Sequence, residues 1–261
     1  MIVSIINNKG GTGKTTTAVN LAAAMAHEGH KVLICDLDPQ ASASLSVGVE
    51  YHRLTPSLFE ILFFCARPEE CIRKTSLGGL DILTGSIDLA SADLHLADVP
   101  GRELVLSEAL SHVRHLYDFI VIDCAPSLSL LQINALTACE RYVIPLLPEY
   151  LTLEGLVSLR DALDRIKSGI GVNPRLLGIV FTMVNPAPFP FLSRELREQT
   201  QIMNLLREYA PGDIFSTVIR RDIALAEAPS YGKTIIEYAP GGRSAREFLA
   251  LSRELIERIK Y

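Results

Sequence analysis

Short apolar runs alternate along the chain with longer segments in which apolar residues recur at helical spacing. Runs of about four to eight residues that are rich in β-branched side chains and apolar throughout are typical of strands covered on both faces. They lie at Ile2–Ile6, Lys31–Cys35, Leu80–Leu83, Phe119–Ile122, Tyr142–Leu147, Leu176–Met183 and Ile214–Ile219. The helical patterns lie near residues 13–28, 102–115, 127–139, 152–168, 192–209 and 244–260. This alternation predicts a single α/β domain over residues 1–261, with a mostly parallel, twisted sheet and helices on both faces.

The composition is that of a folded protein without a membrane span. Hydrophobic residues make up 48% of the 261 residues and charged residues 21%, which excludes a disordered chain. No stretch of 18 residues lacks a charge or a strong break, so no spanning helix is expected. The start, MIVSIINNKGG, lacks the basic segment of a secretory signal, and we expect a cytoplasmic protein.

The cysteines and the charges exclude several kinds of site. The five cysteines form no C-x-x-C pair, which argues against a disulfide framework or a zinc site, and Cys35 and Cys124 are expected to be buried. The net charge is −5, with −7 over residues 1–150 and +2 over residues 151–261. Bulk attraction to nucleic acid is therefore not expected, whereas a local basic face in the second part of the chain remains open.

A glycine-rich segment follows the first apolar run and precedes a helix. It reads Asn8-Lys9-Gly10-Gly11-Thr12-Gly13-Lys14-Thr15-Thr16. The phosphate-binding pattern G-x-x-x-x-G-K-[ST] is met at Gly13, Lys14 and Thr15, while Asn8 stands in place of the first glycine. Glycines let successive backbone N–H groups point at an anion, and the helix N-terminus adds positive potential. Lys14 can then reach the β- and γ-phosphates of a nucleotide, and the Thr15 hydroxyl suits Mg²⁺.

Acidic residues end two of the apolar runs. Residues 31–40 read KVLICDLDPQ and residues 118–126 read DFIVIDCAP. An apolar strand that ends in Asp is the pattern of a carboxylate that holds Mg²⁺ beside a phosphate loop, which points to Asp123. Together with the glycine-rich segment, this pattern predicts a P-loop NTPase-like domain.

The motif KGGTGKTT resembles the deviant phosphate loop of the ParA/MinD family of ATPases. SLLQINALTAC, IPLLPEYLTLEGL and LAEAPSYGKTIIEYAPGGRSA are similar to ParA and Soj partition proteins, and the resemblance spans residues 1–260. No helix-turn-helix segment precedes the first apolar run, as in the short form of the family.

The resemblance implies a Mg²⁺-dependent ATPase that forms an ATP-bound homodimer. Lys9 matches the family's signature lysine, which reaches the partner's phosphates. Asp38 would orient or deprotonate the attacking water, and Asp36 would lie near the ion. The implied catalytic residues are therefore Lys9, Lys14 and Asp38, and the implied metal residues are Thr15, Asp36 and Asp123. The implied ATP contacts are Lys9, Gly10, Gly11, Thr12, Gly13, Lys14, Thr15, Thr16, Met183 and Asn185.

Family members of this form bind DNA without sequence preference and work with a ParB-like or other stimulating partner. The candidate DNA contacts are Arg194, Arg220, Arg221, Lys233, Arg243 and Arg246, with Arg197 nearby. The sequence departs from the family at Ala224, where an arginine is common, and at the proline-rich segment Asn185–Phe191. That segment is expected to be a stiff surface loop, whose two phenylalanines either pack on the body or contact a partner or nucleotide.

Two other functions stay open at this point. A ParA-like switch can position a protein assembly without binding DNA, and a kinase or reductase of the same superfamily is a third class. The last helix carries the stripe Phe248, Leu251, Leu255 and Ile259, which suits packing on the sheet or, in MinD-like proteins, a membrane surface. Packing on the sheet is the expectation, with no membrane partner.

Overall fold

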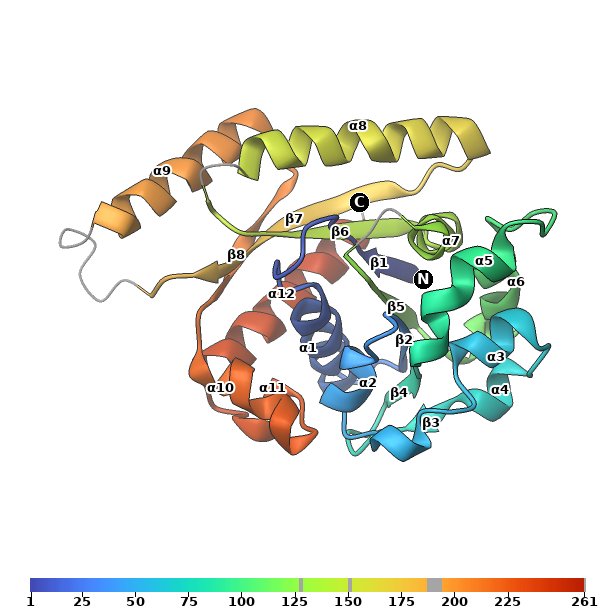
Figure 1. Cartoon of the computed structure of the whole chain (residues 1–261). Coiled ribbons are helices and arrows are strands. Elements are labelled where there is room, and N and C mark those ends of the chain that lie inside the picture. The colour runs from blue at the N-terminus through green and yellow to red at the C-terminus, as the bar shows by residue number, and fades with distance from the viewer. Residues whose placement is uncertain (127–128, 150–151, 187–193, 261) are drawn as a thin grey trace.

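A computed structural model describes residues 1–126, 129–149, 152–186 and 194–260. Its strands form one eight-stranded sheet in the order β3-β4-β2-β5-β1-β6-β7-β8 (Figure 1). They are β1 (Ile2–Ile5), β2 (Val32–Leu37), β3 (Arg73–Lys74), β4 (Leu80–Leu83), β5 (Phe119–Cys124), β6 (Arg141–Leu146), β7 (Arg175–Val184) and β8 (Ile214–Arg220). All neighbouring pairs are parallel except β3 with β4. The prediction of a mostly parallel sheet is therefore confirmed.

The seven apolar runs all become strands, and only β3 was missed. β3 has two residues, is antiparallel and lies at the sheet edge, so it is too short to produce an alternating pattern.

The six long helical patterns correspond to α1, α6, α7, α8, α9 and α12. The helices are α1 (Lys14–His27), α2 (Ser42–Ser46), α3 (Leu58–Phe63), α4 (Pro68–Cys71), α5 (Ala92–Leu96), α6 (Val105–Ser111), α7 (Leu130–Ala138), α8 (Thr152–Ile170), α9 (Arg194–Tyr209), α10 (Ile223–Glu227), α11 (Ile235–Tyr238) and α12 (Arg243–Lys260). The missed helices α2 to α5, α10 and α11 have four to six residues each, which is less than two helical turns. Parts of the patterns near 127–139 and 192–209 lie outside the described residues.

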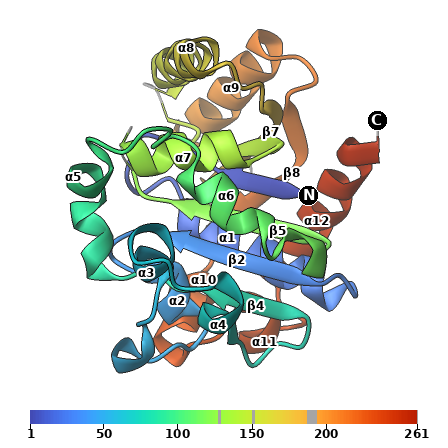
Figure 2. The same ribbon diagram turned by 90° about the vertical axis from the view of Figure 1, so that its right-hand side faces the viewer.

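Helices cover both faces of the sheet (Figures 1 and 2), and a hydrophobic layer fills each side. Val3 and Ile5 of β1 pack with apolar residues of α1, α11 and α12, whereas Ile2 and Ile6 pack with those of α3 and α5 to α9. Successive residues of a strand face opposite sides, so a strand covered on both sides has to be apolar throughout. This burial explains why the runs lack polar alternation.

The last helix packs on the protein, as expected. Phe248, Leu251 and Leu255 of α12 are fully buried in the layer that includes α1, and Ile259 is partly buried. Cys35 and Cys124 are also buried. Among the described residues, no helix is both long and apolar enough to cross a membrane.

Candidate functional site

The glycine-rich segment lies at the carboxyl edge of the sheet, directly after the central strand β1. β5 and β6 flank β1, so the crossovers on its two sides diverge and leave a crevice at this edge. Asp36 of β2 and Asp123 of β5 are register partners near the carboxyl ends of those strands. The order of the strands therefore brings the predicted phosphate loop and two acidic residues to one place.

Contacts from β6 and β7 hold the phosphate loop (residues 8–15). The Asn7 side chain donates to the Pro145 carbonyl at 2.7 Å and accepts from the Lys9 N–H at 3.0 Å. The Thr182 hydroxyl donates to the Thr12 carbonyl at 2.9 Å. Gly13 precedes α1 with φ of 79°, a conformation that glycine adopts without a Cβ clash. The loop is thus shaped before any ligand arrives.

Lys14 lies inside this loop. Its side chain is only 6% exposed, and Nζ donates to the Lys9 carbonyl oxygen at 2.8 Å. Burial lowers the pKa of Lys14, and the nearby Asp123 carboxylate partly offsets this effect. An ammonium held by a single described hydrogen bond has two further N–H groups with which to bind phosphate oxygens.

The two register-paired carboxylates have different surroundings. Asp36 is fully buried, and its Oδ2 accepts from the Ser44 N–H at 2.8 Å and from the Ser44 hydroxyl at 2.6 Å. Asp123 is equally buried, but neither of its oxygens accepts a hydrogen bond from the described residues. Burial, followed by the charge of Asp36, raises the pKa of Asp123 well above its usual range. The Thr15 hydroxyl lies close enough to oppose that shift without being in hydrogen-bonding geometry.

These residues fit a magnesium ion. Mg²⁺ prefers oxygen ligands, keeps several waters and takes few carboxylates. Asp123 supplies a buried carboxylate without a described hydrogen bond, and Thr15 supplies a hydroxyl beside it. One oxygen of Asp36 already accepts two hydrogen bonds from Ser44, so Asp36 adds negative charge near the ion and fixes α2 beside the site. The three predicted metal residues are thus brought together, with Asp123 the best placed.

Asp38 lies just beyond the buried pair and is partly exposed. Its N–H donates to Asp36 Oδ1 at 3.2 Å, and its own Oδ1 accepts from the Gln40 N–H at 2.9 Å. Its charge acts on both Lys14 and Asp123, so it lies close to the phosphate loop. A partly exposed carboxylate in this place can accept a hydrogen bond from a water molecule.

The Lys9 side chain lies against α8. A Cβ at Gly155 would lie 2.9 Å from Lys9 Nζ, so glycine leaves the room that this side chain occupies. Sequence reasoning did not identify Gly155 or Ser44 as part of the site. A glycine inside a helical pattern is a weak signal for the first, because it costs about 1 kcal/mol relative to alanine.

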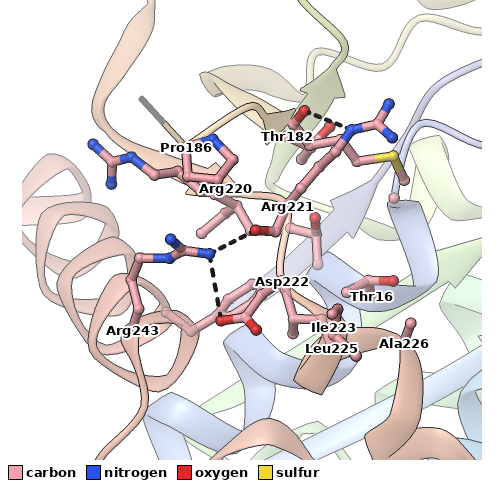
Figure 3. A pocket seen from close by; sticks show the side chains of 15 residues that line it. Thr16, Thr182, Pro186, Arg220, Arg221, Asp222, Ile223, Leu225, Ala226 and Arg243 are labelled. Atoms are coloured by element: carbon pink, nitrogen blue, oxygen red, sulfur yellow. Dashed lines mark hydrogen bonds and ion pairs between the residues drawn. The ribbon is translucent and has the colours of Figure 1, made fainter. Parts of the chain in front are cut away.

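A cavity of about 650 Å³ lies beside the start of α1 (Figure 3). Gly13, Thr16 and Thr17 form one wall, and the carboxyl ends of β7 and β8 with residues 221–226 form the other. The size and largely apolar lining suit a nucleotide base next to the phosphate loop. Of the two expected ATP contacts from this region, Met183 lines the cavity, whereas Asn185 is not among its lining residues and donates its N–H to the Gln199 side chain.

Three of the candidate DNA contacts lie around the same cavity (Figure 3). Arg220 pairs with Glu247 at 2.7 Å, and Arg221 Nε donates to the Met183 carbonyl at 3.4 Å. Arg243 donates to the Arg221 carbonyl at 2.6 Å. These arginines make internal contacts and remain solvent-accessible: Arg221 is exposed, and the side chains of Arg220 and Arg243 are 42% and 38% exposed.

Of the other candidates, Arg246 lies one turn after Arg243 on α12. Arg246 donates to the Gly241 carbonyl, and Lys233 is exposed in the turn that precedes α11. The side chain of Arg194, and residues 187–191 of the proline-rich segment, lie outside the described residues.

The chain resembles known proteins over nearly its full length. The family model described as an AAA domain matches residues 1–176. The sporulation initiation inhibitor protein Soj of Bacillus subtilis is 38% identical, over 97% of each chain. The chromosome partitioning protein ParA of Myxococcus xanthus is 37% identical, over 98% of this chain and 88% of that protein.

A solved structure of the septum site-determining protein MinD from Pyrococcus horikoshii, complexed with Mg-ADP, has a TM-score of 0.75. It is 28% identical and covers 100% of this chain and 98% of that one. The sequence relatives, the AAA-domain match and the parallel sheet with its phosphate loop all indicate the same family. The chain belongs to the ParA/Soj family of P-loop ATPases.

Proposed function

We propose that this protein is a Mg²⁺-dependent ATPase that hydrolyses ATP to ADP and phosphate and uses the cycle to segregate or position chromosome or plasmid DNA. The observation that carries the proposal is the buried Asp123, without a described hydrogen bond, near Lys14 and Thr15 of the phosphate loop. Such a carboxylate is costly unless a cation compensates it, and the site has the ligands that Mg²⁺ prefers. The relatives named ParA and Soj support the role in partitioning.

Each residue has a defined part in this proposal. The backbone N–H groups of residues 10–15 and the Lys14 ammonium bind the phosphates, and Thr15 and Asp123 hold the ion. A magnesium ion held by these residues would supply positive charge against the charge that develops on the phosphate oxygens. Asp38 orients the attacking water or accepts its proton, because it is the partly hydrated carboxylate at this edge. The cavity beside Thr16 and Met183 takes the adenine base.

Lys9 acts in trans in the proposed ATP-bound homodimer. Its ammonium lies beside Gly155 of α8, and the residue is exposed. Lys9 can therefore contact a second protomer. In the dimer it reaches the partner's phosphates and adds positive charge where the transition state needs it.

The substitution Asp38→Ala tests this mechanism. The variant should bind ATP with wild-type affinity, because the phosphate loop is untouched, and hydrolyse it ~100-fold or more slowly, because the water loses its positioning group. It should then accumulate as an ATP-bound dimer, measured by light scattering with saturating Mg-ATP. The exposed Asp98→Ala is the matched control and should turn over ATP normally. A monomeric Asp38→Ala protein under saturating Mg-ATP would argue strongly against the ATP-bound dimer.

The dimer is proposed to bind DNA without sequence preference and to be stimulated by a ParB-like partner. The deciding experiment is an ATPase assay with and without duplex DNA and with the product of the neighbouring gene. Turnover that responds to the partner but not to DNA, with no ATP-dependent retention on DNA, would instead favour a switch that positions a protein assembly. A protein that acts on DNA in this way works in the cytoplasm, at the nucleoid.

A further inference from the structure

The Lys9 side chain lies in a notch beside the first turn of α8. A Cβ at Gly155 would lie 2.9 Å from Lys9 Nζ, 3.0 Å from Cε and 4.0 Å from Cδ, so the side chain runs along this glycine. A small cavity of about 30 Å³ continues the notch between the phosphate loop and α8, and its lining includes Glu149, Thr152 and Leu156. We call this feature the Gly155 notch. A methyl group at position 155 would displace Lys9 from it.

The main chain of Lys9 is held in place, whereas its side chain is able to move. The Lys9 N–H donates to Asn7 Oδ1 at 3.0 Å, and the Lys9 carbonyl accepts from Lys14 Nζ at 2.8 Å. The residue is nevertheless exposed, and the flexible stem of an exposed lysine changes rotamer readily. Lys9 can therefore leave the notch by side-chain rotation alone, while the phosphate loop keeps its shape.

The notch holds the ammonium weakly. Gly155 lies in the first turn of α8, where the backbone N–H groups create a positive potential that disfavours a cation. Glu149, which lines the same cavity, offsets part of this effect, but a contact between exposed charges contributes little. A weak contact of this kind suits a group that has to move to another place.

We propose that the Gly155 notch is the resting position of Lys9, and that the side chain has to leave it before the ATP-bound dimer forms. This inference rests on the proposed function, in which Lys9 reaches the partner's phosphates. While its ammonium lies beside Gly155, Lys9 is engaged by its own protomer. Gly155 is then a positioning residue, because the room that it leaves stabilises the resting state and lowers the fraction of protomers that are ready to dimerise.

The test compares Gly155→Ala with Gly169→Ala, a matched control in the same helix. A Cβ at Gly169 would meet nothing within 4 Å, whereas a Cβ at Gly155 would displace Lys9. Both changes replace a helical glycine with alanine, so both should stabilise α8 to a similar extent. The atoms that have to shift at position 155 are the far end of a flexible side chain, so this variant should fold.

The first measurement is the rate at which an N-hydroxysuccinimide ester acylates Lys9 in the nucleotide-free protein. Tandem mass spectrometry separates Lys9 from the buried Lys14, and the exposed Lys31 serves as the internal reference. We expect Gly155→Ala to raise the Lys9 rate about 3-fold relative to Lys31, since loss of a weak contact shifts the population only that far. Gly169→Ala should leave the ratio unchanged.

The second measurement is the protein concentration at half-maximal dimerisation with saturating Mg-ATP, made in the slowly hydrolysing Asp38→Ala background. Gly155→Ala should lower this concentration at least ~3-fold, because both protomers have to release Lys9. Gly169→Ala should not change it. The affinity of the protomer for Mg-ADP should be equal in all of these proteins, because the notch lies outside the phosphate-binding residues 10–15.

Three results would overturn the proposal. An unchanged acylation ratio in Gly155→Ala would show that the notch does not hold Lys9, while leaving the proposed ATPase intact. A higher ratio with unchanged or weaker dimerisation would show that release of Lys9 has no effect or that the dimer itself needs the notch. A parent Asp38→Ala protein that stays monomeric with Mg-ATP would refute the proposed dimer and the resting role with it, whatever the acylation ratio.

Discussion

Replacing Lys14 with methionine is expected to weaken ATP binding at least ~100-fold and to abolish measurable turnover. A unit charge about 4 Å from a phosphate is worth about 4 kcal/mol at the effective dielectric of a partly buried site, and methionine keeps the apolar stem without that charge. Because burial of the ammonium carries a cost, the variant should unfold at the wild-type temperature or slightly above it. Isothermal titration with ATP and a thermal melt measure the two effects.

Lys14→Arg separates charge from shape. The planar guanidinium is wider than an ammonium, and Lys14 is 6% exposed inside the loop, so arginine should not restore turnover. The exposed Lys31→Met controls for loss of a lysine elsewhere. Wild-type ATP affinity in Lys14→Met would show that the loop is not a phosphate site.

The substitution Asp123→Asn is expected to stabilise the nucleotide-free protein while removing its response to magnesium. The ionised carboxylate is buried without a described hydrogen bond and faces Asp36, and an unsatisfied buried polar group costs about 1–3 kcal/mol. Asparagine removes the charge and keeps the shape. Chemical unfolding without nucleotide should show the gain. Mg-ADP, which raises the melting temperature of the wild type by mass action, should raise that of the variant much less.

The stability gained by Asp123→Asn should depend on pH. The folded-state pKa of Asp123 is raised above its unfolded value, so the folded protein holds a proton that the unfolded chain releases. Wild-type stability should therefore fall as pH rises from the unfolded pKa through the folded pKa. The gain from Asp123→Asn should be complete above that window and absent below it. The exposed Asp161→Asn should show no such dependence. A wild-type curve that rises through the window would contradict the assignment of Asp123 as the costly group.

The elements that sequence predicts well here are the long ones buried on one or both sides. The seven apolar runs became strands because a strand covered on both faces leaves no position for a polar residue. The short helices α2, α10 and α11 were missed, although α2 carries Ser44 and residues of α10 line the cavity beside α1. Their form depends on local caps and tertiary contacts rather than on periodicity.

Some parts of the candidate site can also be predicted from the sequence and others cannot. The phosphate loop could be predicted from spacing alone because contiguous residues make its N–H cradle. The hydrogen bond between Ser44 and Asp36 could not be predicted, because no simple sequence pattern encodes the turn that brings Ser44 to Asp36. The basic residues show the same limit. Arg220, Arg221 and Arg243 are candidate DNA contacts by sequence, and only the fold shows that they also border the cavity beside α1, next to Glu247 and Asp222.

By itself, the sequence determined the parallel α/β fold, the phosphate loop of Gly13, Lys14 and Thr15, and the acidic ends of β2 and β5. All of these depend on chemistry that is local in the chain. Only the tertiary structure decided that Asp36 and Asp123 are register partners with unequal hydrogen bonding. It also decided that Lys9 lies against Gly155, and that Arg220 pairs with Glu247 beside the cavity at α1. Burial, pairing and charge proximity arise between segments distant in sequence, and strand order sets which segments meet.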